Sequence, residues 1–192
     1  LALHLSVTQD LVNMIRPEKF HVSWESAWSW YPFVVQAKGV AVNGQSRSQQ
    51  WELHATSASG SISLLPLVLK RVSVSGVRAQ DVDYRQRPRL KPDRDYSNKL
   101  AHFPPITGRE FIAADTSPRK NKRPWKVSLR EMQASGQHTF WIFNLKGSGA
   151  GSAMVDLSIE TRGGPFSLDA RELDLLLGPA YVNGNAELYR GG

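Results

Sequence analysis

Residue types that carry out catalysis or bind metals are present in this chain, but they are not grouped into a site. Ser117 and Lys120 have the S-x-x-K spacing in which a lysine one helical turn away activates a serine. That mechanism needs a buried helix, and here the spacing falls in a proline-rich basic segment, so chance explains it better. Asp81 and Asp83 share one face of a predicted strand, where flanking arginines favour a solvated carboxylate pair over acid–base chemistry.

Other catalytic and metal-binding signatures are missing from the sequence. The chain has no cysteine, no Walker A motif and no G-x-S-x-G elbow, and none of its five histidines stands at metal-ligand spacing from another histidine or a carboxylate. We therefore expect a protein that is not an enzyme, with no catalytic residues, no cofactor and no metal.

The positive charge of the chain is concentrated in one segment. The whole chain carries 24 basic and 17 acidic residues, a net charge of +7, while residues 85–124 alone hold 11 basic and 4 acidic residues, or 11 − 4 = +7. Such a segment attracts anionic headgroups, nucleic acid or acidic proteins if it is exposed, and the alternative is a solvated loop that maintains solubility. The candidate anion-binding or partner-binding residues are Arg85, Arg87, Arg89, Lys91, Arg94, Arg119, Lys120, Lys122 and Arg123.

A second candidate surface is a cluster of aromatic residues near the N-terminus. No basic residue lies between its first and last members, which argues against stacking of nucleic-acid bases. Tryptophan and tyrosine favour membrane–water interfaces, and the alternative is an ordinary hydrophobic entry to the core. The cluster comprises Trp24, Trp28, Trp30, Tyr31 and Phe33.

The hydrophobic pattern predicts a mainly β protein. Apolar residues at helical spacing predict a short helix over 1–16, and from Phe20 onward the period becomes two, which is typical of strands. We expect a hairpin turn at Asn43-Gly44, a short helix or turn over 61–69, and a bulge at Gly76, where the alternation shifts phase.

Together these elements predict one β-rich domain over residues 1–192. It would contain an antiparallel meander of about eight or nine strands, an N-terminal helix, a short middle helix and a long basic, proline-rich insert over 85–124. Alternation gives the meander one apolar face, which must be hidden in a barrel, against a second sheet or in a curved trough. The sequence alone leaves these three open.

Nothing in the sequence is long and apolar enough to span a membrane as a helix, since the longest apolar run is only Leu64–Leu69 and contains a proline. The opening residues Leu1–Leu5 fit either the end of a removed signal peptide or anchor helix, or the start of an ordinary helix.

The order of elements over residues 1–85 resembles the N-terminal region of AsmA-like proteins of the Gram-negative envelope, which are related to the TamB group. In that pattern a strand ends in a short S-L-x-x-L helix, and a strand of the type I-x-V-x-G-V follows. The segments that carry the resemblance are Phe20–Trp24, Tyr31–Gly44, Trp51–Ala55, Ile62–Lys70, Arg71–Arg78 and Asp81–Tyr84.

The resemblance implies an inner-membrane anchor and a periplasmic body, with a curved β-sheet whose apolar groove serves lipid movement or outer-membrane biogenesis. The chain is shorter than most such proteins and carries an unusual basic insert. A body of this length would have to oligomerise, act as an adaptor or serve a local role.

We accordingly expect a non-enzymatic periplasmic envelope protein, tethered to the inner membrane by a segment that precedes Leu1, with lipid or a membrane surface as its partner. The alternative is a structural or assembly subunit that docks on a larger complex through its sheet edge and basic loop. Nucleic-acid binding through the insert ranks lowest, because no recognisable nucleic-acid module is present.

Overall fold

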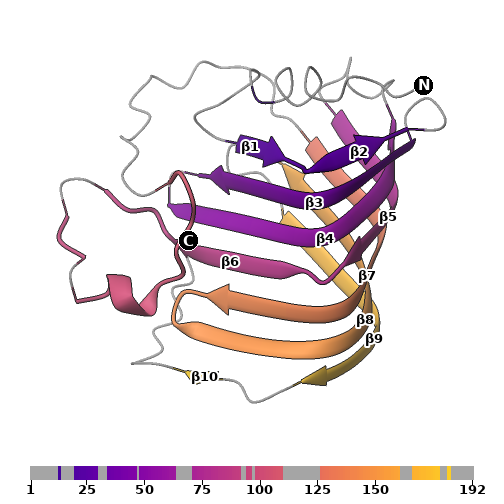
Figure 1. Cartoon of the computed structure of the whole chain (residues 1–192). Coiled ribbons are helices and arrows are strands. Elements are labelled where there is room, and N and C mark those ends of the chain that lie inside the picture. The colour runs from indigo at the N-terminus through magenta and orange to yellow at the C-terminus, as the bar shows by residue number, and fades with distance from the viewer. Residues whose placement is uncertain are drawn as a thin grey trace.

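The computed structural model describes residues 13, 20–29, 34–46, 48–63, 71–91, 94–96, 98–109, 126–160, 166–177 and 181–182. These residues form one ten-stranded sheet, so the mainly β prediction is confirmed (Figure 1). The elements are β1 (Phe20–Ser23), β2 (Ser26–Trp28), β3 (Val34–Gln45), β4 (Gln49–Ser63), β5 (Arg71–Gln80), β6 (Asp83–Pro88), the 3-10 turn η2 (Leu100–His102), β7 (Lys126–Ile142), β8 (Leu145–Glu160), β9 (Phe166–Leu177) and β10 (Tyr181–Val182).

The sheet is mixed, which corrects the predicted pure antiparallel meander. Its order is β1-β3-β4-β5-β7-β8-β10, with β2 beside β3, β6 beside β4 and β7, and β9 beside β8. All pairs are antiparallel except those that β5 and β6 make with β7, which are parallel. Parallel neighbours need a long crossover connection, and residues 89–125, between β6 and β7, provide it.

The long strands bend near their middles, so that the sheet curls (Figure 1). Residues with positive φ lie at this level, within β3 and β7 and between β5 and β6. They are Gly39 at 57°, Gly136 at 101° and Asp81 at 52°. Asp81 separates β5 from β6, and its backbone and side chain both bond to β7. Its N–H donates to the Ser135 carbonyl (3.1 Å), and its Oδ1 accepts from the Gln137 N–H (3.0 Å). These bonds fix the bend between neighbouring strands.

The predicted bulge at Gly76 is confirmed. Ser61 pairs with Ser75 and Ser59 with Arg78, so that Gly76 and Val77 together stand opposite Gly60. Gly76 has φ of 59°, a conformation that glycine adopts at little cost. A bulge strengthens the local twist of a strand, and it therefore adds to the curvature of the sheet.

The predicted hairpin turn at Asn43-Gly44 is wrong. Both residues lie inside β3, paired with Glu52 and Trp51, and the chain reverses between Ser46 and Gln49, whose backbone groups are bonded at 2.8 Å. Glycine is needed at position 44 for another reason: a Cβ there would lie 2.6 Å from Cζ2 of the Trp51 indole. A cross-strand contact, and not a turn, explains this glycine.

Little of the two predicted helices falls within the described residues. Residues 61–63 complete β4 instead of a helix, and residues 64–70 lie outside the described part of the chain. Of residues 1–16 the structure describes Asn13, whose backbone is helical. The insert also begins later than predicted, because residues 85–88 belong to β6. Among the residues that the structure describes, no helix is long and apolar enough to cross a membrane.

Candidate functional site

One face of the sheet carries large apolar side chains on neighbouring strands. Val42 pairs with Leu53, Leu53 with Tyr84 and Tyr84 with Phe140, which gives one row across β3, β4, β6 and β7. Residues opposite one another in register share a face. We call this surface the apolar tract; it consists of Val40, Val42, Trp51, Leu53, Tyr84, Phe140 and Ile142.

The side chains of the apolar tract are not sealed in a core. All seven are half-buried. The largest fully buried apolar side chains in the described part of the chain, Leu90 and Ile106, belong to the insert. Among the strand side chains whose burial the structure describes, the buried apolar ones are the small Ala37 and Ala55, and Leu145, at one end of the tract, is 38% exposed. The described sheet therefore leaves part of a large apolar surface in contact with solvent.

The apolar tract ends at the bend. Along β4, Trp51, Leu53 and Ala55 occupy alternate positions, and the next positions in this phase are Ser57 and Ser59. Because side chains two apart on a strand share a face, the face changes from apolar to polar within one strand. On β4 the apolar face therefore does not continue in this phase past the bend.

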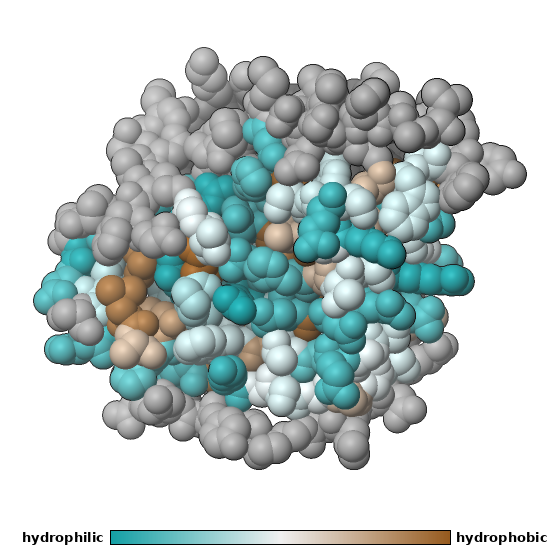
Figure 2. Space-filling view, in the orientation of Figure 1, coloured by the Kyte–Doolittle hydropathy of each residue, from teal (hydrophilic) through white to brown (hydrophobic). Residues whose placement is uncertain are grey.

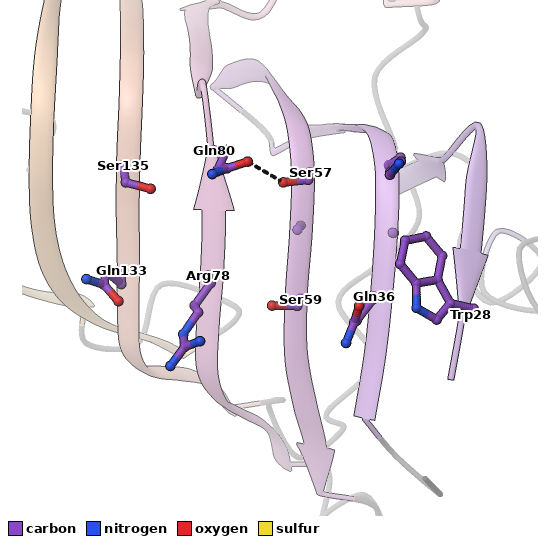
Figure 3. A pocket seen from close by; sticks show the side chains of 11 residues that line it. Trp28, Gln36, Ser57, Ser59, Arg78, Gln80, Gln133 and Ser135 are labelled. Carbon is purple, nitrogen blue, oxygen red and sulfur yellow. Dashed lines mark hydrogen bonds between the residues drawn. The ribbon is translucent and has the colours of Figure 1, made fainter. Parts of the chain in front are cut away.

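A hollow of about 490 Å³ lies at the bend, where that face turns polar (Figure 3). Its side chains come from two cross-strand rows, Gln36–Ser59–Arg78–Gln133 and Lys38–Ser57–Gln80–Ser135. The Ser57 hydroxyl donates to Oε1 of Gln80 at 3.1 Å. The lining residues are Trp28, Gln36, Ala37, Lys38, Ser57, Ala58, Ser59, Arg78, Gln80, Gln133 and Ser135.

Two of the predicted anion-binding residues are buried instead of exposed. Arg87 is 4% and Arg89 is 7% exposed. Arg87 donates from Nε to Gln50 Oε1 (3.1 Å), from Nη1 to the Pro104 carbonyl (3.2 Å) and from Nη2 to the Arg109 carbonyl (3.3 Å). These contacts hold the first part of the insert against the end of the sheet, and they leave neither arginine on the surface.

The buried polar cluster around Arg87 was missed by sequence reasoning. Gln50, which is fully buried, donates to the Arg109 carbonyl at 2.5 Å, and Arg109 donates from Nε to Asn43 Oδ1 at 3.1 Å. Its members come from β3, β4, β6 and the insert, so their proximity depends on strand pairing that the sequence does not show.

Figure 2 shows mainly hydrophilic residues on the viewed face, with a hydrophobic group at its left, over the insert.

The remaining basic candidates are partly described. Arg85 forms an ion pair with Asp83 (2.7 Å), Lys91 is half-buried and Arg94 is exposed. The other four, Arg119, Lys120, Lys122 and Arg123, lie outside the described residues.

The aromatic cluster is likewise described only in part. Trp24 and Trp28 are half-buried, and Lys38 Nζ lies 6.0 Å from the centre of the Trp28 ring. Trp30, Tyr31 and Phe33 lie outside the described residues. Trp28 is therefore the member of the cluster that the structure places at a candidate site, the polar hollow.

Titratable groups do not converge on a reactive centre in the described part of the chain. No group of three metal-ligating side chains is found there. His54 lies 3.3 Å from Glu52, and burial raises the pKa of Tyr84 above its ordinary value of 10.0. The Tyr84 hydroxyl donates to Gln86 Oε1 at 2.7 Å. This tyrosine belongs to the apolar tract.

Comparison of the chain with protein-family models and with curated proteins finds no match. Any function must therefore be argued from the two surfaces on this face of the sheet, the apolar tract and the polar hollow.

Proposed function

We propose that the protein binds lipid on the apolar tract, as a non-enzymatic β-groove protein that carries or holds lipid in a bacterial envelope. The observation that carries this proposal is the half-buried state of seven large apolar side chains on adjoining strands. Among the side chains whose burial the structure describes, the large apolar ones that are fully buried, Leu90 and Ile106, belong to the insert. A contiguous apolar surface that stays partly in contact with solvent is typical of a ligand or interaction site.

The dimensions of the tract suit acyl chains. The apolar positions of β4 run from Trp51 to Ala55, four residue steps or about 13 Å, and the tract crosses several strands. Each CH₂ group that it buries contributes about 0.8 kcal/mol. Burial of eight such groups would contribute about 6 kcal/mol before the entropy of ordering the chain is subtracted.

The AsmA-like resemblance points in the same direction. It supplies the proposed setting, a periplasmic body tethered to the inner membrane, and the proposed role in lipid transport or outer-membrane biogenesis. The curvature of the sheet (Figure 1) and its half-buried apolar tract support that resemblance. The parallel pairing of β5 and β6 with β7 is a feature of this chain that the resemblance did not lead us to expect.

Lipid uptake from liposomes, read by native mass spectrometry, tests the proposal. We expect the protein to retain bound lipid and the Leu53→Asp variant to lose at least tenfold in bound lipid, because a carboxylate in the tract disfavours acyl chains. Thr56→Asp places the same charge at an exposed position on the opposite face of β4 and serves as the control. Val40→Trp fills the tract without adding charge and should also reduce uptake. Wild-type protein that takes up no lipid would contradict the proposal.

An assembly role is the second candidate, and the β9 edge favours it. Within the described residues β9 pairs with β8 alone, over 12 residues, and a long edge strand can pair with a strand of another protein. Crosslinking in cells distinguishes the two: a stoichiometric protein partner crosslinked to β9 supports assembly, and a monomer with bound lipid supports the first proposal.

A further inference from the structure

We propose that the polar hollow at the bend binds a phosphate ester, so that it recognises the anionic headgroup of a lipid whose acyl chains lie on the adjoining apolar tract. The inference deepens the proposed function and rests on it for the source of the phosphate. The anion site itself is argued from the hollow alone.

The charge of the hollow is positive. Lys38 and Arg78 line it, and none of its lining residues is an aspartate or glutamate. Both cations are exposed, and no ion pair joins either of them to a carboxylate in the part of the chain that the structure describes. Two unneutralised cations beside one hollow attract an anion.

The positions of the two cations allow them to act on one ligand. Lys38 lies on β3 and Arg78 on β5, with β4 between them, and they stand in neighbouring rows. Two strand spacings across the sheet and two residues along it give a separation of about 12 Å. The β4 residues between them are Ser57 and Ser59, whose short side chains leave space above the strand (Figure 3). Long side chains from both sides can therefore converge over the serines.

The uncharged groups of the hollow suit an oxygen-rich ligand. Gln36 and Gln133 present amide donors from opposite sides, and the Ser59 hydroxyl lies between them in the same cross-strand row. Arginine, amide and hydroxyl donors are the groups with which proteins bind phosphate oxygens. The Trp28 ring forms an apolar wall at the β2 side, where it suits the carbon atoms of a headgroup.

The hollow and the apolar tract adjoin each other on one face. Ala55 ends the apolar positions of β4, and Ser57 follows two residues later, about 6.6 Å further along the strand. An amphipathic molecule that laid its chains over Leu53 and Trp51 would thus bring its polar end over Ser57. The change from apolar to polar side chains within one strand matches the change from tail to headgroup in a phospholipid.

Three probes and two matched double variants test the inference. The probes are dioleoylphosphatidylglycerol, dioleoylglycerol with the same acyl chains but no phosphate, and free glycerol 3-phosphate. The hollow variant is Lys38→Gln with Arg78→Gln. The control variant is Lys99→Gln with Arg71→Gln, which removes two exposed charges that lie outside the hollow.

We expect the hollow variant to bind phosphatidylglycerol about a hundredfold more weakly than the wild type, or about tenfold for each cation removed, and to bind dioleoylglycerol unchanged. The control variant should keep wild-type affinity for both lipids. Lys38→Arg with Arg78→Lys should restore most of the lost binding. If the double variant does not fold, Ser59→Asp provides a second test. It keeps both cations but places a carboxylate between them, and it should likewise weaken phosphatidylglycerol binding and leave dioleoylglycerol binding unchanged.

The outcomes separate the two proposals. Hollow-dependent binding of glycerol 3-phosphate without uptake of either lipid supports the anion site, assigns it to a soluble phosphate ester, and contradicts the proposed lipid function. Equal phosphatidylglycerol binding by wild type and hollow variant overturns the inference. Loss of binding only in the Lys99 and Arg71 variant also overturns it and assigns the headgroup to a surface outside the hollow.

Discussion

Replacement of Arg87 by methionine tests whether the insert is fastened to the sheet or is an exposed basic arm. Arg87→Met keeps much of the side-chain volume but removes every donor of a guanidinium that is 4% exposed. Gln50 Oε1 and the Pro104 carbonyl each lose the arginine donor, while the Arg109 carbonyl keeps its bond from Gln50. Two buried acceptors without a donor cost about 1–3 kcal/mol each, so we expect a loss of about 4 kcal/mol.

Denaturant and thermal unfolding measure that loss. For a chain of this size, about 4 kcal/mol corresponds to a fall of about 12 °C in Tm. Hydrogen exchange should show faster exchange of backbone amides over 98–109 in the variant. Arg94→Met, at an exposed position of the same insert, serves as the control and should change the free energy of unfolding by less than about 0.5 kcal/mol. Equal stability of the two variants would refute a structural role for Arg87.

Three further predictions concern the sheet. Gly44→Val should lower the free energy of unfolding by about 2–3 kcal/mol because the new side chain collides with the Trp51 indole; Gly44→Val combined with Trp51→Ala should recover part of that loss in chemical denaturation. The Asn13 side chain bonds to both the N–H and the carbonyl of Val22, at 2.8 Å each, so Asn13→Ala should cost about 1–2 kcal/mol, and no change in unfolding would contradict that contact. Burial raises the folded-state pKa of Tyr84 above 10.0, so the unfolded chain loses this proton first as pH rises, and the free energy of unfolding should fall above pH 10. Tyr84→Phe should flatten that fall. An equal dependence of the free energy of unfolding on pH in both proteins would contradict the role of Tyr84.

The strands of this protein could be predicted because alternation is a local property of the sequence. The Gly76 bulge was predictable for the same reason, since the phase of Val74 and Val77 changes at the glycine. Gly44 was misread because the sequence signal of a turn glycine is the same as that of a glycine beneath an aromatic ring. Only the pairing of β3 with β4 distinguishes the two.

The features that depend on non-local pairing could not be predicted. A long proline-rich connection is compatible with either an antiparallel or a parallel neighbour, so the pairing of β5 with β7 was not determined by the sequence. Burial of Arg87 and Arg89 contradicts the usual solvation of charge runs. At the sheet end Arg87 donates to Gln50 and to insert carbonyls, and Arg89 donates to the Ser46 carbonyl in the turn between β3 and β4. The hollow combines side chains from separate strands. The serines at 57 and 59, in phase with Trp51 and Leu53, were its only local signal.

Photocrosslinking by a lipid with a diazirine in its acyl chain tests the central claim most directly. Protein loaded with phosphatidylglycerol that carries this group would be irradiated and digested, and the labelled residues identified by mass spectrometry. Lipid binding on the apolar tract predicts labels on Val42, Leu53 and Phe140, and none on Asn43 or His54 of the opposite face. Labels confined to Asn43, His54 or the insert would contradict the account.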